Sequence, residues 1–145
     1  MFGPSQIHCF DDARRIARRR LPWMVFDYID GAAGSETGAA YSAQALRGVR
    51  LAPRILRNVE NRSISTRIFD HDAALPFGIA PMGMCNLAAP KADEMLARLA
   101  AKHSIPVGVS TVASTSLERM AELSEGNAWF QLYISGDRSG TDRLV

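Results

Sequence analysis

Gln131 and Tyr133 place an amide and a phenol near the end of an apolar segment, Trp129–Ile134. The segment has the length and composition of a buried strand, and β/α barrels carry their active-site groups at the carboxyl ends of such strands. An amide both donates and accepts hydrogen bonds, which suits a planar ring that carries C=O and N–H side by side. Taken alone, a tyrosine in this position is more often a half-buried core residue, so the prediction of a site depends on the rest of the chain.

Polar groups also follow two earlier apolar segments, Pro76–Pro81 and Val107–Thr111, which are read as strands buried on both faces. The groups at these two ends are the backbone of Pro81, Met82 and Gly83 and the hydroxyls of Ser110 and Thr111. None of them is charged or strongly basic, so the set favours hydrogen bonding to a flavin-like ring over proton abstraction. Gly83 would let backbone approach a ligand closely. The hydroxyl pair has a second interpretation, as a helix cap.

Helices are predicted after each of these three strands. Apolar residues at helical spacing mark the first helix over 92–100, with Asp93 in its first turn. Thr115 and Glu118 have the spacing of a capping box and predict the start of the second helix. The run 139–142 is typical of the first turn of a third helix.

Residues 76–145 therefore alternate between strand and helix, and the short links imply parallel strands. A doubly wound sheet usually has a glycine-rich phosphate turn after its first strand, but this chain has Ala80-Pro81-Met82-Gly83-Met84 there. The fold class is thus α/β, and the pattern favours the N-terminal portion of a TIM (β/α)8 barrel, with about the first three strands. A complete barrel takes about 250 residues.

Residues 1–75 are predicted to form an N-terminal helical and extended segment that precedes the barrel units of 76–145. Asp11 is expected to cap the first helix, and Pro22 to occupy the first turn of the second. The expected elements are helices over 11–20, 23–30 and 36–47, an extended run over 51–56 and a short strand over 64–69. On spacing alone, Tyr28 in the second helix is a neighbour of an aromatic core stripe.

The composition excludes several classes of function. The chain has 145 residues, of which 47% are hydrophobic and 22% charged, as in globular proteins. A net charge of +2 is too small to imply nucleic acid, although arginines cluster over 14–20, as a solvated helix face or as a patch for a partner subunit or anionic lipid. Cys9 and Cys85 form no CxxC, and with the 3 histidines they have no metal-ligand spacing. With no secretory signal and no apolar run of ~20 residues, a cytoplasmic location is expected.

Six short motifs follow one another along the chain. They are Leu21-Pro22 with Phe26-Asp27-Tyr28, Pro53-Arg54-Ile55-Leu56, Ile79-Ala80-Pro81, Ala97-Arg98, Ser110-Thr111 and Gln131-Leu132-Tyr133. In this order and spacing the chain resembles the FMN-dependent α-hydroxy-acid dehydrogenase/oxidase family, which includes glycolate oxidase, L-lactate dehydrogenase and mandelate dehydrogenase. Each motif is weak by itself, but six together are specific, and they span the chain from about Phe10 onward.

The resemblance implies FMN as cofactor and a small 2-hydroxy acid as substrate, which is oxidised to a 2-oxo acid. Tyr28 matches the tyrosine that binds the substrate carboxylate. Tyr133 matches a second active-site tyrosine, which is catalytic and lies beside the substrate hydroxyl. The groups matched to the cofactor are the backbone of Pro81, Met82 and Gly83 against the flavin, the hydroxyl of Ser110 on its ring and the amide of Gln131 at its pyrimidine side.

Two positions depart from the family pattern. Val112 stands where plant glycolate oxidase has tryptophan, which leaves the preferred substrate size open. The run Ala89-Pro90-Lys91-Ala92-Asp93 replaces the common His-Pro-x-Gly-Glu.

In the family the histidine base, a substrate-binding arginine, a flavin lysine and the phosphate site come late in the barrel, beyond Val145. The histidines here do not match that base: His8 precedes the first helix, His71 is placed in a polar turn, and His103 is near a helix end. We therefore expect an N-terminal fragment that is inactive alone and needs the missing C-terminal half. The full-length enzyme is expected to be a homo-oligomer. Peripheral association of that enzyme with the inner membrane is compatible with this expectation. The alternative is a non-enzymatic truncated product that binds or interferes with full-length subunits.

Overall fold

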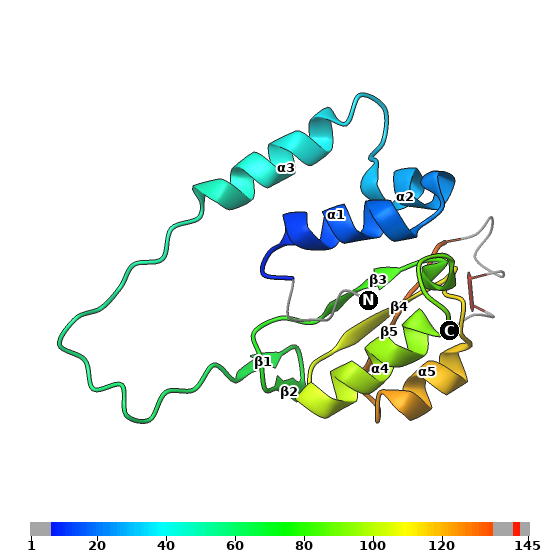
Figure 1. Cartoon of the computed structure of the whole chain (residues 1–145). Helices are drawn as coiled ribbons and strands as arrows, with labels where there is room; N and C mark the ends of the chain where they lie inside the picture. The colour runs from blue at the N-terminus through cyan, green and yellow to red at the C-terminus, as the bar shows by residue number, and fades with distance from the viewer. Residues whose placement is uncertain (1–6, 135–140, 143–145) are drawn as a thin grey trace. The chain divides into compact units, whose positions relative to one another are not determined.

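The computed structural model describes residues 7–134 and 141–142, which fall into two compact units, Met1–Glu60 and Asn61–Val145. Among the described residues, the regular elements are three helices in the first unit and, in the second, five strands, two α-helices and a 3-10 turn, besides the helical residues 141–142 (Figure 1). Each unit is described by itself below.

The three helices of the first unit are α1 (Phe10–Arg20), α2 (Trp23–Asp30) and α3 (Thr37–Gly48), close to the predicted ranges. Two details of the prediction are wrong. The N-cap of α1 is Cys9, while Asp11 lies inside the first turn, where a carboxylate is favoured by the helix dipole. Pro22 is the N-cap of α2 and so precedes its first turn.

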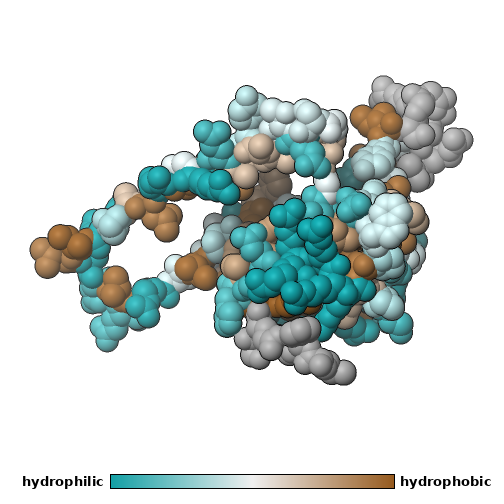
Figure 2. All heavy atoms as spheres, turned by 45° about the horizontal axis from the view of Figure 1, so that its top comes forward, coloured by the Kyte–Doolittle hydropathy of each residue, from teal (hydrophilic) through white to brown (hydrophobic). Residues whose placement is uncertain are grey.

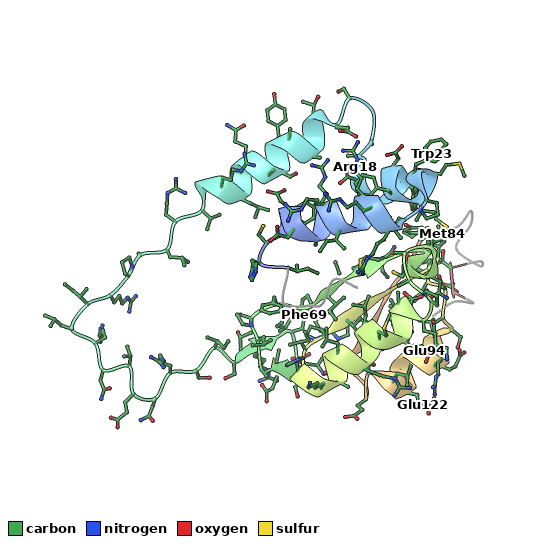
Figure 3. The ribbon with its side chains drawn as sticks, in the orientation of Figure 1. Arg18, Trp23, Phe69, Met84, Glu94 and Glu122 are labelled. Carbon is green, nitrogen blue, oxygen red and sulfur yellow. The ribbon has the colours of Figure 1, made fainter. Side chains whose placement is uncertain are left out.

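Helices α1 and α2 are joined by a bidentate ion pair between Arg14 and Asp30, with N–O distances of 2.6 and 2.7 Å. Phe26 of α2 is buried, and the guanidinium carbon of Arg18 lies 6.0 Å from the centre of its ring. Trp23, by contrast, is 73% exposed (Figure 3). The expected aromatic core stripe is therefore reduced to Phe26.

Residues 49–65 form neither helix nor strand, and Leu56, at the end of the run predicted to be extended, has a positive φ of 57°. Their hydrophobic side chains are exposed and appear as brown spheres along this segment (Figure 2). Leu51 is 92% exposed and Leu56 is fully exposed.

The second unit begins with an antiparallel hairpin of β1 (Thr66–Ile68) and β2 (His71–Ala73). His71 thus lies in a strand, and its placement in a polar turn was wrong. The turn itself contains Phe69, which has a positive φ of 51°. The ring of Trp129 lies 5.4 Å from that of Phe69 and 6.1 Å from that of His71.

The main sheet has three parallel strands in the order β3 (Ile79–Met82), β4 (Val107–Ser110) and β5 (Ala128–Gln131). Helices α4 (Ala92–His103) and α5 (Leu117–Leu123) link the strands and pack against each other (Figure 1). Arg119 of α5 forms ion pairs with Glu94 of α4 at 3.8 Å and with Glu122 at 2.6 Å. The predicted β-α-β-α-β order is confirmed.

The core of this unit lies between the sheet and its two helices. Its buried members are Ala97, Ala100, Ile105, Val107, Val109, Met120 and Leu123. Only the central strand β4 is well buried: β3 is mostly exposed and all four residues of β5 are half-buried. The expectation of buried strands was therefore wrong for the two outer strands, each of which pairs with β4 alone among the described residues.

Strand β3 contains a bulge opposite β4. Ile79 pairs with Val107 and Met82 pairs with Val109, so β3 has one more residue than β4 between the two pairs. Pro81 lies in this interval and has no N–H for a ladder hydrogen bond, which is why prolines in sheets occur at such irregularities. The strand begins at Ile79, later than the predicted Pro76.

Three further boundaries differ from prediction. The cap of α5 is Ser116, whose side chain accepts a hydrogen bond from the backbone N–H of Arg119, so the capping box at Thr115 was misplaced by one residue. Strand β5 ends at Gln131, so Tyr133 follows the strand. Of the predicted third helix, residues 141 and 142 are helical and Ser139 lies outside the described residues.

Candidate active site

The carboxyl ends of the three parallel strands lie next to one another at one edge of the sheet. Ser110 is the partner of Gln131 in the β4–β5 register, and Met82 at the end of β3 is the partner of Val109. The structure thus brings together five of the predicted cofactor groups, because parallel strands must end on the same side. These groups are Pro81, Met82, Gly83, Ser110 and Gln131.

Ser110 is only 5% exposed, and its hydroxyl is part of a tight turn. The Oγ accepts a hydrogen bond from the N–H of Val112 at 3.2 Å, and the carbonyl of Ser110 accepts one from Ala113 at 3.0 Å. A hydroxyl that accepts one hydrogen bond keeps its own proton for donation. The turn therefore orients Ser110 and leaves it one donor.

Gly83 lies close against the side chain of Val112 in the loop after β4. A Cβ at this position would lie 2.5 Å from Cγ2 of Val112 and 3.7 Å from Oγ of Ser110. The next residue, Met84, donates its N–H to the carbonyl of Val112 at 3.0 Å. The loops after β3 and β4 are thus held in direct contact, and a side chain on Gly83 would push them apart.

Thr111 makes two hydrogen bonds across the ends of β4 and β5. Its hydroxyl donates to the backbone carbonyl of Gln131 at 2.6 Å and accepts from the backbone N–H of Tyr133 at 2.9 Å. Tyr133 itself is 54% exposed. The backbone on both sides of Leu132 is therefore fixed by one threonine side chain.

Asp93 is a buried carboxylate behind this edge, and the sequence analysis placed it only as a favourable first-turn residue. It is 3% exposed, and its Oδ2 accepts a hydrogen bond from the N–H of Ser114 at 2.7 Å. The Oγ of Ser114 in turn accepts from the N–H of Asn86 at 3.4 Å. Asp93 thus ties the start of α4 to the loop after β4. An acidic residue just after a strand-to-helix link was the available signal.

Burial, aided by the negative charge of Asp93, raises the pKa of the Cys85 thiol to about 11. The thiol hydrogen points toward protein acceptors, since Sγ lies 3.6 Å from the carbonyl oxygen of Met82. Cys85 is therefore protonated at neutral pH and is no nucleophile.

Tyr28 belongs to the first unit and is described apart from the strand ends. It lies on α2, is 61% exposed, and borders an open hollow with Asp27, Gly31 and Glu36. The hydrogen bonds and charge of Arg14 hold the pKa of the nearby Asp30 carboxyl below its usual value. The end of α2 is therefore anchored by an ion pair two residues after Tyr28.

No group of three or more His, Cys, Asp or Glu residues in the described part of the chain is arranged to hold a metal ion. None of the helices in that part is both long enough and apolar enough to cross a membrane.

Comparison with known proteins identifies close relatives. The model of the FMN-dependent dehydrogenase family matches residues 17–145. The L-lactate dehydrogenase of Pseudomonas syringae pv. syringae (strain B728a) is 39% identical over 127 residues, which are 88% of this chain and 33% of that protein. The L-lactate dehydrogenase of Pseudomonas putida (strain W619) is 37% identical over the same shares. The chain thus spans about a third of the length of these relatives.

Solved structures give the same result. A crystal structure of mandelate oxidase R163L with 2-hydroxy-phenylacetamide matches with a TM-score of 0.86 and 34% identity, over 92% of this chain and 40% of that one. A soluble mutant of the membrane-associated (S)-mandelate dehydrogenase from Pseudomonas putida matches with a TM-score of 0.83 and 34% identity, over 92% of this chain and 38% of that one. The chain belongs to the FMN-dependent α-hydroxy-acid dehydrogenase family of flavoprotein oxidoreductases.

Proposed function

We propose that this chain is the N-terminal part of an FMN-dependent enzyme that oxidises a small 2-hydroxy acid to a 2-oxo acid. The observation that carries the proposal is the set of neutral hydrogen-bonding groups on three adjacent parallel strand ends. The proposed architecture is the first β/α units of a (β/α)8 barrel over 76–145, preceded by a helical and extended segment over 1–75. The arrangement supports a barrel because such sites lie at the carboxyl ends of parallel strands.

The chemistry of the strand-end groups fits the ring system of FMN. The donors and acceptors are backbone groups of Pro81, Met82 and Gly83, a hydroxyl on Ser110 and an amide on Gln131. When bound, FMN accepts the two electrons removed from the substrate, and the protein orients the ring and adjusts its electronics. An uncharged set of donors and acceptors can bond the C=O and N–H groups of a flavin edge without a desolvated charge.

Tyr28 and Tyr133 are the proposed substrate-binding residues. A phenol donates a hydrogen bond, so Tyr28 would bind the carboxylate of the acid and Tyr133 its 2-hydroxyl oxygen. Tyr133 is also the proposed catalytic residue, since a hydrogen bond to the 2-hydroxyl orients the group from which the proton leaves. Its half exposure leaves the phenol free to meet a small ligand.

We further propose that residues 1–145 are inactive without the rest of the barrel. His71 is in β2, with its ring tilted against that of Trp129, and His103 ends α4 just before β4, so both lie away from the carboxyl strand ends. His8 belongs to the first unit. Lack of a positioned base costs ~100- to 10,000-fold in rate. The complete protein is proposed to form a homo-oligomer.

The test uses the complete gene product, loaded with FMN, and three matched variants. Dye reduction with lactate, glycolate and mandelate should show turnover, with kcat or kcat/KM reduced ~10- to 1,000-fold in Tyr133→Phe and Tyr28→Phe. Tyr41→Phe is the control, because Tyr41 is exposed on α3 and outside the proposed site. Equal activity of all three variants would refute the proposal that Tyr28 and Tyr133 bind the substrate. Absence of turnover with every 2-hydroxy acid would refute the proposed reaction and favour a non-enzymatic product.

A further inference from the structure

The side chain of Thr111 occupies the place of a missing rung in the β4–β5 ladder. Val107 pairs with Ala128, and its N–H donates to the carbonyl of Asn127 at 2.9 Å. In a parallel ladder every second residue of one strand bonds the residues before and after its partner. Counting on from Val107 by twos, the backbone of residue 111 would bond the carbonyl of Gln131 and the N–H of Tyr133.

The backbone cannot make that rung because β4 ends at Ser110. There the chain turns, with the N–H of Val112 bonded to Oγ of Ser110 and its carbonyl bonded to Met84. The hydroxyl of Thr111 makes both bonds of the missing rung, one to Gln131 at 2.6 Å and one to Tyr133 at 2.9 Å. One donor and one acceptor on a single oxygen replace the N–H and C=O of a peptide group.

We infer that Thr111 is a positioning residue for the active site. Resting on the proposed function, this inference assigns Thr111 to the alignment of the two residues proposed to meet the flavin and the substrate hydroxyl. Strand β5 has ended at Gln131, so the described residues show no ladder bond that would otherwise hold the N–H of Tyr133. Without the Thr111 hydroxyl, the backbone that holds the phenol of Tyr133 would be free to shift. A shift of about 1 Å is enough to impair catalysis.

The chain offers well-matched variants for a test. Thr111→Val keeps the shape of the side chain and removes the hydroxyl, whereas Thr111→Ser keeps the hydroxyl. Thr115→Val is the control, since Thr115 lies in the same loop and its hydroxyl makes no hydrogen bond to another described residue. All variants are made in the complete, FMN-loaded gene product.

Two measurements are combined: hydrogen exchange of the Tyr133 amide, resolved by fragmentation mass spectrometry, and steady-state kinetics. Thr111→Val should raise the exchange rate of that amide ~10-fold, as expected for loss of one hydrogen bond. It should lower kcat about 10-fold with a smaller change in KM, because a displaced phenol acts on the reacting state. Thr111→Ser and Thr115→Val should stay close to the wild-type protein in both measurements.

The outcomes separate this inference from the proposed function. Unchanged amide exchange in Thr111→Val overturns the inference, whatever the activity. Increased exchange with unchanged kcat and KM overturns the positioning role. Increased exchange confined to Thr111→Val in a protein that oxidises no 2-hydroxy acid supports the hydrogen-bond bridge and refutes the proposed function.

Discussion

Uncharged hydrogen-bonding groups lie at the carboxyl ends of the strands, and Cys85 and Asp93 lie in the segment that follows β3. Asp93 is 3% exposed and Cys85 is half-buried, whereas Ser110, Gln131 and Tyr133 present hydroxyls and an amide. The orientation of hydrogen bonds therefore matters more at this edge than titration near neutral pH. The turns that set this orientation are the features on which function should depend most.

The Cys85 thiol should react with alkylating agents far more slowly than that of Cys9. A pKa of about 11 leaves a very small thiolate fraction at pH 8, and Cys9 is exposed. Since the thiolate is the nucleophile, we expect at least ~100-fold slower labelling of Cys85 by iodoacetamide in the folded protein. Peptide mass spectrometry of timed samples measures both sites, and Cys9 is the internal control.

The raised pKa of the Cys85 thiol also makes the stability of the folded protein depend on pH. The folded state holds the Cys85 proton more tightly than the unfolded state, whose thiol has a pKa of about 8.5. The stabilisation is thus fully present below the unfolded pKa and is lost as pH rises toward the folded pKa of about 11. Labelling of Cys85 as fast as Cys9 at pH 8 would show that its thiol is neither buried nor shielded.

At the scale of single elements, close packing of β3 on β4 requires a glycine at position 108. A Cβ there would lie 2.6 Å from Cδ and 2.7 Å from the backbone N of Pro81, in the bulged part of β3. Gly108→Ala should therefore destabilise the protein by ~1–3 kcal/mol, because the ring of a proline in a strand cannot move aside. The measurement is a denaturant unfolding curve.

Gly38→Ala is the matched control. Gly38 lies in α3, and a Cβ there meets nothing within 4 Å. In a helix the same change should be neutral or stabilising by ~0.5–1 kcal/mol. If Gly108→Ala were as stable as Gly38→Ala, β3 and β4 could not approach as closely as described.

The link between α4 and the loop after β4 depends on the carboxylate of Asp93. Asp93→Ala removes a buried carboxylate and leaves the N–H of Ser114 without its acceptor at a partly buried site, which should cost ~1–2 kcal/mol. Asp93→Asn keeps an acceptor oxygen and should lose less. Asp70→Ala is the control, since the Asp70 side chain is 96% exposed. Equal unfolding free energies for the three variants would mean that the Asp93 carboxylate does not stabilise the fold.

The sequence predicted the order of elements well because their signals are local. Helical spacing located α4, and apolar runs located β4 and β5. The groups at the strand ends were also predictable, since parallel strands end together. The roles of Thr111 and Asp93 were not, because each contacts a residue about twenty positions away along the chain. The prediction that β3 and β5 are buried was wrong, because the burial of a strand depends on which neighbouring elements cover it.

At the scale of the whole molecule, the described sheet has two strands with one ladder partner each, β3 and β5. Large apolar side chains near them are exposed, including Phe77 at 57% and Ile134 at 82%. Unpaired strand edges of this kind pair with other chains. About two thirds of the length of relatives such as the L-lactate dehydrogenases lies outside the matched region, since 33% of each is covered.

A polypeptide of residues 1–145 made alone is therefore expected to self-associate. Exposed apolar side chains beside strand edges favour association, and we expect them to form a larger contiguous apolar patch than the few hundred Å² that soluble monomers usually carry. Sedimentation velocity should show large assemblies, and flavin fluorescence should show weak binding of FMN or none. Co-expression with the remainder of the gene product should instead give a soluble, yellow complex, because the added strands would pair with the free edges. A monomeric 145-residue chain with one sharp thermal transition would contradict this, and it would mean that β3 and β5 are stable as free edges.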